Sequence, residues 1–120
     1  MIIEQQQSER SVHDLSIAKV DAHVKLVAEA LPFPVELDAD MGGSFTLFID
    51  LGTRGNEDDP ADTAGIEPHG ADATWWINFP EEERVEISEL TIDAAPHEVA
   101  AWIADAATKA GSPAAARMAA

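Results

Sequence analysis

Apolar residues recur at helical spacing near the start of the chain. The intervals of three and four residues place them on one face of a helix: Ile17, Val20, Val24, Val27 and Leu31. Ser11 suits the N-cap position, and Pro32 ends the pattern because proline disfavours the helical conformation of the residue before it. The spacing therefore predicts a helix over residues 12–31, preceded by a flexible N-terminus over residues 1–11.

Three later segments alternate apolar and polar residues, which is the pattern of a β-strand with two different faces. They span residues 44–51, 73–79 and 84–92, and a weaker strand pattern covers residues 35–38. Residues 80–83 form the turn between the second and third segments, which favours antiparallel pairing. The apolar parity changes between Ile87 and Leu90, so we expect either a β-bulge near Ser88–Glu89 or partial cover on both faces.

A second helix is predicted after the last strand. Pro96 suits its first turn, Gly111 suits the position just past its end, and its apolar stripe comprises Val99, Trp102, Ile103, Ala106 and Ala110. Residues 112–120 are expected to form a mobile C-terminal tail. The order α-β-β-β-α predicts an α+β fold in which two helices pack on one face of a three-stranded, mainly antiparallel sheet. Residues 12–111 would form the single domain.

The segment over residues 52–72 carries no apolar pattern. It has four glycines, two prolines, six acids and one arginine, and we expect an acidic loop there. A structureless loop of this length in a small domain is usually functional or disordered.

Charge is the strongest compositional feature of the chain. The 120 residues include 23 acids and seven Lys or Arg, for a net charge of −16, and residues 35–93 alone carry sixteen of the acids and only two bases, Arg54 and Arg84. Nucleic acids and anionic membranes would repel such a chain, so neither is an expected partner, whereas a basic protein surface is. The alternative explanation of the negative charge is adaptation to high salt, because salt-loving organisms have acidic proteomes.

Candidate chemistry is sparse. The chain has no cysteine, no nucleotide-binding loop and no hydrolase or zinc-protease motif, so we expect neither an enzyme nor a cofactor. His13, His23 and His97 are expected at helix surfaces or edges, while His69 in the acidic loop is the best candidate for a metal or catalytic group. The acids over residues 57–62 do not have the spacing of a calcium loop. No leader or membrane-spanning pattern is present, and we expect a soluble, cytoplasmic protein.

The sheet face that points away from the helices is the predicted binding surface. We expect Phe45, Leu47, Trp75, Ile77, Phe79, Val85 and Ile87 to face the helices. Phe48 and Trp76 would then face away, with Thr46, Asp50, Asn78, Glu86 and Ser88 around them. Aromatic side chains inside a charged rim are typical of protein interfaces. With the acidic loop added, the predicted partner-binding residues are Phe48, Asp50, Trp76, Asn78, Glu86, Glu57, Asp58, Asp59 and Asp62.

These features favour a non-catalytic binding module of inhibitor or antitoxin type. It would cover a basic surface of a partner protein, including a surface that otherwise binds nucleic acid, by presenting carboxylates where phosphates would lie. Small phage-encoded inhibitors and bacterial immunity proteins often have this size and charge. Two alternatives stay open: a small ligand- or metal-binding domain or enzyme that uses the 52–72 loop, and a structural subunit that dimerises through Trp76 and Phe48.

Overall fold

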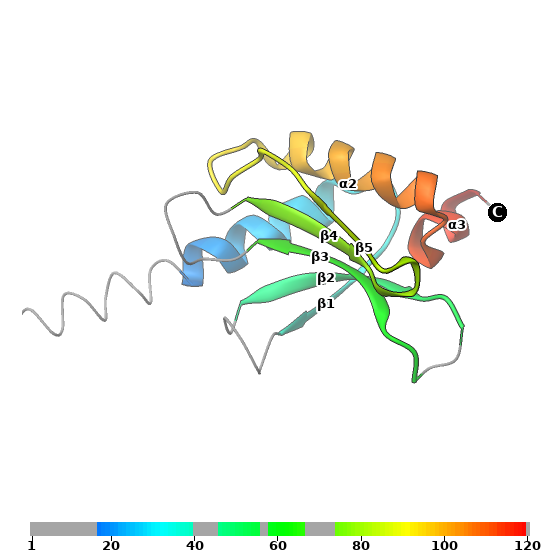
Figure 1. Ribbon diagram of the computed structural model, residues 1–120. Helices are drawn as coiled ribbons and strands as arrows, with labels where there is room; N and C mark the ends of the chain where they lie inside the picture. The colour runs from blue at the N-terminus through cyan, green and yellow to red at the C-terminus, as the bar shows by residue number, and fades with distance from the viewer. Residues whose placement is uncertain (1–16, 40–45, 56–57, 67–73, 120) are drawn as a thin grey trace, which may run out of the picture.

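The computed structural model describes residues 17–39, 46–55, 58–66 and 74–119. An N-terminal helix covers residues 17–30 and is followed by five strands, β1 (Glu36–Ala39), β2 (Leu47–Thr53), β3 (Ala61–Ile66), β4 (Trp75–Phe79) and β5 (Arg84–Ile87). A short 3₁₀ helix, η1 (Pro80–Glu82), joins β4 to β5, and two helices, α2 (Pro96–Ala110) and α3 (Pro113–Ala119), complete the fold. Figure 1 shows the N-terminal helix and α2 on the same side of the sheet.

The sheet is an antiparallel meander in which each strand pairs with the next, in the order β1-β2-β3-β4-β5. Alternate residues of the three central strands form the buried face: Ile49, Leu51, Ala64, Ile66, Trp75, Ile77 and Phe79. The helices cover this face with their own apolar stripes, which include Val20, Val24, Val27, Val99 and Ile103. Helices and sheet therefore share one core, and the opposite sheet face is left without a helix among the described residues.

The expected three-stranded sheet is wrong, because the sheet has five strands. The weak pattern over residues 35–38 is a real edge strand, β1, and the predicted loop over residues 52–72 contains β3. β3 lacks a strand signal because its residues are mostly small, yet it lies between β2 and β4, where both neighbours bond to its backbone. Such pairing overrides a weak local preference.

α2 begins and ends at the predicted residues. Pro96 occupies its first turn, and Gly111 ends it with a φ of 75°, a left-handed conformation that glycine adopts at little cost. The irregularity expected near Ser88–Glu89 is also present. Trp75 accepts a hydrogen bond from the Ser88 backbone N–H and donates one to the Leu90 carbonyl, so residues 88–90 all lie opposite this one residue. The displacement returns Leu90 to the core side of the sheet.

The expected mobile tail over residues 112–120 instead contains α3. The Ser112 carbonyl accepts from the Ala116 N–H at 2.9 Å, and Ala114 and Ala115 are buried against the core. Ser112 followed by Pro113 is a typical helix start, and this signal was present in the sequence. The predicted flexible N-terminus over residues 1–11 lies outside the described residues.

A β-bulge in β2 positions α3 on the sheet. The register shifts between Asp50 and Gly52, and Gly52 has a φ of 98°. The Asp50 carboxylate accepts a hydrogen bond from the Gly52 N–H at 2.7 Å, which closes the turn of the bulge. A Cβ atom at Gly52 would lie 2.9 Å from the Cβ of Pro113, so only glycine lets the start of α3 lie this close to β2.

Candidate functional site

The candidate site is the sheet surface opposite the helices, which we call the open face. Its residues follow from the strand registers and comprise Glu36, Asp38, Phe48, Asp50, Thr63, Gly65, Trp76, Asn78, Val85 and Ile87. Side chains directly opposite one another on one face of a sheet are in contact range, so these residues form rows across the strands.

Two such rows run across the open face, and in both the side chains change from acidic at one edge to apolar at the other. The first joins Asp38, Phe48, Gly65, Trp76 and Ile87. The second joins Glu36, Asp50, Thr63, Asn78 and Val85. Each row begins with one carboxylate at β1 and ends with an aliphatic side chain at β5. The open face is therefore acidic at one edge and apolar at the other.

Gly65 lets an aromatic ring lie against the sheet. A Cβ atom at this position would lie 2.9 Å from Cζ2 of Trp76 and 3.3 Å from Cβ of Phe48. The Trp76 indole thus covers the glycine, beside Phe48, and both aromatic side chains are only partly buried. This arrangement gives the centre of the open face an aromatic surface between the acids and the aliphatic edge.

Two hollows flank this aromatic centre. The apolar one, of about 410 Å³, is lined by Thr74, Trp76, Asn78, Val85 and Ile87.

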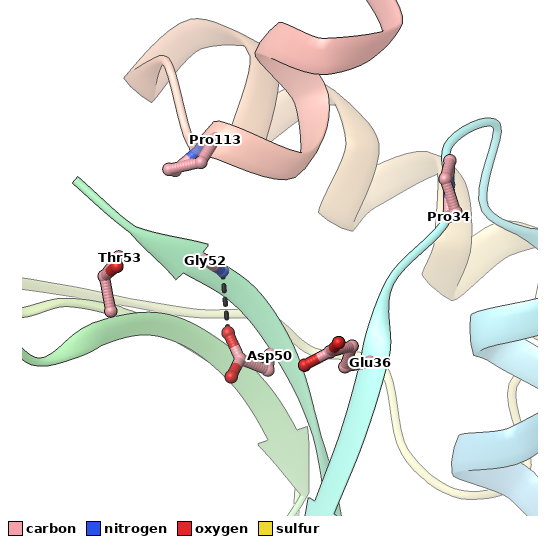
Figure 2. A pocket seen from close by; sticks show the side chains of 6 residues that line it. All are labelled: Pro34, Glu36, Asp50, Gly52, Thr53 and Pro113. Carbon is pink, nitrogen blue, oxygen red and sulfur yellow. Dashed lines mark hydrogen bonds between the residues drawn. The ribbon is translucent and has the colours of Figure 1, made fainter. Parts of the chain in front are cut away.

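The second hollow, of about 490 Å³, lies where β1, β2 and the start of α3 meet, and Figure 2 shows the carboxylates of Glu36 and Asp50 side by side in it. Like charges directly opposite on neighbouring strands repel each other. This hollow therefore holds two of the three carboxylates of the open face, and Asp50 is fixed there by its bond to Gly52.

The predicted orientation of β5 is reversed. Val85 pairs with Asn78 and Ile87 with Trp76, so both aliphatic side chains lie on the open face, while Glu86 pairs with Ile77 and points to the helix side. Val85 is 55% exposed and Ile87 is 74% exposed. Alternation within a strand predicts which residues share a face but not which face is covered, and the register with β4 decided this.

The structure brings together four of the predicted binding residues, Phe48, Asp50, Trp76 and Asn78, on the open face. Asp58 is exposed in the turn before β3, and Asp59 beside it is half-buried. Glu57 lies outside the described residues, and so does Phe45. Thr46, expected on the open face, is buried. Sequence reasoning missed six open-face residues: Glu36, Asp38, Thr63, Gly65, Val85 and Ile87. The length of the β4–β5 turn could have suggested the register that places Val85 and Ile87 there.

Asp62 is fully buried and holds an internal polar network, so it is not part of any surface. Its Oδ2 atom accepts from Nε of Arg54 at 2.9 Å and from Oγ of Ser112 at 2.6 Å. Nη2 of Arg54 lies 2.8 Å from the same oxygen and 2.8 Å from Oε2 of Glu82. The hydrogen bond to Asp62 raises the pKa of Arg54 above its usual value. The network ties β3 to η1 and to the start of α3.

Arg84, the other base of residues 35–93, also forms ion pairs with neighbouring acids. It pairs with Glu82 and with Glu86, and its guanidinium lies 4.5 Å from the centre of the Phe79 ring. The hydrogen bond from Arg84 is the largest cause that lowers the pKa of Glu82. Because both bases of residues 35–93 are paired within the chain, neither is available to balance the acids of the open face.

Of the four histidines, the structure describes two, His23 in the N-terminal helix and His97 in α2. His23 is buried, contrary to its expected place at a helix edge, and its Nε2 accepts a hydrogen bond from the Trp75 indole at 3.1 Å. Burial lowers the pKa of His23, against a smaller opposing effect of Asp93, so the ring is held neutral. His97 is exposed in the first turn of α2. His13 and His69 lie outside the described residues.

Within the described part of the chain, no three His, Cys, Asp or Glu side chains gather as metal ligands would. None of the helices described is both long and apolar enough to cross a membrane.

Comparisons with known proteins find no matching family model, no matching curated protein and no matching solved structure.

Proposed function

We propose that this chain is a non-catalytic binding module of inhibitor or antitoxin type, whose open face covers a basic surface of a partner protein. The observation that carries the proposal is the gradient across the open face, from the carboxylates of β1 and β2 through Trp76 to the aliphatic edge at β5. Acidic groups raise the rate of association with a basic partner and orient it. Aromatic and aliphatic side chains supply the buried contact area that slows dissociation.

The distribution of charge supports the same proposal. A net charge of −16 opposes self-association and attracts cationic surfaces over distances comparable with the Debye length. Arg54 and Arg84 pair with other acids, and no ion pair among the described residues joins Glu36, Asp38 or Asp50 to a base. An Arg or Lys of the partner would supply the missing counter-charge and could lie against Trp76 at the same time.

The test begins with capture of partners from a lysate of the source cells at low and at high salt. We expect a basic protein that is retained at low salt and released at high salt. With that protein purified, Glu36→Gln combined with Asp38→Asn should weaken binding about fivefold. Trp76→Ala should weaken it about thirtyfold, as the loss of a central aromatic contact does.

The matched control removes two charges from the helix side of the molecule, where Glu29 and Glu98 are exposed. Glu29→Gln combined with Glu98→Gln changes the net charge equally and should leave the affinity nearly unchanged. Equal weakening by the two double variants would show that the open face is not the binding surface. Failure of wild-type protein to retain any salt-sensitive partner would refute the proposed function as a whole.

A further inference from the structure

β5 forms one edge of the sheet and pairs only with β4 among the described residues. In an antiparallel pair, alternate residues direct their backbone N–H and C=O groups to the same neighbour. The Ser88 N–H donates a hydrogen bond to the Trp75 carbonyl. The backbone N–H and C=O groups of Glu86 and Arg84, two and four residues earlier, therefore also point toward β4. The backbone groups of Val85 and Ile87 consequently point outward, away from the sheet.

The two edges of the sheet differ in how well they are protected against pairing with another chain. β1 carries Glu36 and Asp38 on an exposed strand, and inserted charges are a usual defence of sheet edges. β5 instead exposes Val85 and Ile87, whose side chains border the apolar hollow of the open face. An exposed edge strand with apolar side chains is a template for the addition of a further strand.

The charges around β5 indicate what kind of strand would fit. Residues 81–89 carry five glutamates against the single base Arg84, which is already paired with Glu82 and Glu86. Glu86 lies on the helix side of β5, whereas Val85 and Ile87 lie on the open face. An added strand with apolar residues on one side and basic residues on the other would place its apolar side chains beside Val85 and Ile87. Its basic side chains would lie on the side of Glu86. A second copy of this chain also has a net charge of −16, so it would be repelled by this acidic edge.

We propose that β5 binds an extended segment of alternating apolar and basic residues by strand addition. This inference rests on the proposed function and specifies how the partner is held. The apolar side chains of the segment lie beside Val85 and Ile87, one of them reaching the apolar hollow, and its basic side chains lie beside Glu86. The backbone of the segment pairs with the outward N–H and C=O groups of Val85 and Ile87.

A synthetic peptide, acetyl-KVKIKVK-amide, is a direct probe. On titration into ¹⁵N-labelled protein, we expect shifts and slowed hydrogen exchange at the Val85 and Ile87 amides. Two N-methylated forms of the peptide give a test that leaves the protein unchanged, one methylated at the odd and one at the even positions. Strand addition uses the N–H groups of one set only, so the two forms should differ in affinity about tenfold or more.

Val85→Pro is the complementary change in the protein. It removes an outward N–H and no bond to β4, so the sheet should remain intact by circular dichroism while peptide binding falls about tenfold. Val85→Ile is the control, because it keeps the N–H group, the branched shape and the apolar surface, and it should retain most of the affinity.

Equal affinities of the two methylated peptides would overturn strand addition. If the unmethylated peptide still binds in a salt-dependent way in that case, the acidic surface proposed above stands. If neither the peptide nor any lysate protein binds, both proposals fail. A concentration-dependent dimer in sedimentation that Val85→Pro converts to a monomer would show that a second copy occupies the edge, and would likewise overturn the inference.

Discussion

Replacement of the buried Asp62 by asparagine should destabilise the protein more than any change to the acidic surface. Asp62→Asn keeps the shape of the side chain and removes its charge. The carboxylate has no exposed surface, and its Oδ2 atom is shared by two nitrogens of Arg54 and the hydroxyl of Ser112. In the variant, Arg54 loses the buried one of its two counter-charges, in a place that water reaches only partly.

The size of the effect follows from these contacts. Removal of one partner of a buried ion pair typically costs about 3–5 kcal/mol. Arg54 retains Glu82 at 2.8 Å and its side chain is 20% exposed, which recovers part of the loss. We therefore expect about 3 kcal/mol, a large fraction of the ~5–15 kcal/mol by which such a domain is stable.

Equilibrium unfolding in urea, followed by tryptophan fluorescence at constant ionic strength, measures this difference. Trp75 is fully buried and reports loss of the core. Asp58→Asn is the matched control, since Asp58 lies four residues away and is exposed. It should change the free energy of unfolding by less than about 0.5 kcal/mol. A loss below about 1 kcal/mol in Asp62→Asn, with an unchanged urea dependence, would refute the assigned role of the network.

Two further predictions concern a backbone position and a buried ring. Gly52→Ala should lower the free energy of unfolding by about 2–4 kcal/mol in urea unfolding, through its positive φ and the contact with Pro113. Gly111→Ala has a positive φ but no neighbour within 4 Å, so it should cost only about 1 kcal/mol, and equal losses would contradict the contact. Burial lowers the pKa of His23, so its contribution to stability is complete above the unfolded value of 6.5 and is lost as pH falls below it. His23→Gln can still accept a hydrogen bond from Trp75 and should flatten the dependence of stability on pH below the unfolded value of 6.5. An unchanged slope would assign that dependence to other groups.

Local patterns predicted the elements that carry strong periodicity. The stripe ending at Leu31 marks the N-terminal helix, the pair Pro96 and Gly111 marks the ends of α2, and the alternation around Ile77 marks β4. These signals succeed because an apolar face that must be buried leaves a repeat of 3.6 or 2 residues in the sequence. β3 left no such repeat, since Ala64 and Gly65 are small enough to fit a crowded sheet centre without being markedly apolar.

The candidate site was only partly predictable for the same reason. Phe48, Asp50, Trp76 and Asn78 share one face by alternation, and the registers place them together. Asp62 has the same local character as Asp58, yet one is buried against Arg54 and the other is exposed. No local pattern separates two acids in an acidic segment, because their burial depends on the pairing of β3 with its neighbours and on a hydroxyl from a distant part of the chain, Ser112.

The sequence alone determined the α+β class, the two long helices and the strong negative charge of the middle of the chain, because periodicity and composition are local properties. The tertiary structure decided the number of strands, the inclusion of α3 in the core, and the side of the sheet on which Val85, Ile87 and Glu86 lie. These features depend on the register between strands and on contacts between residues far apart in the chain, such as Asp62 with Ser112. Register and long-range contacts arise only when the whole sheet and its helices pack together.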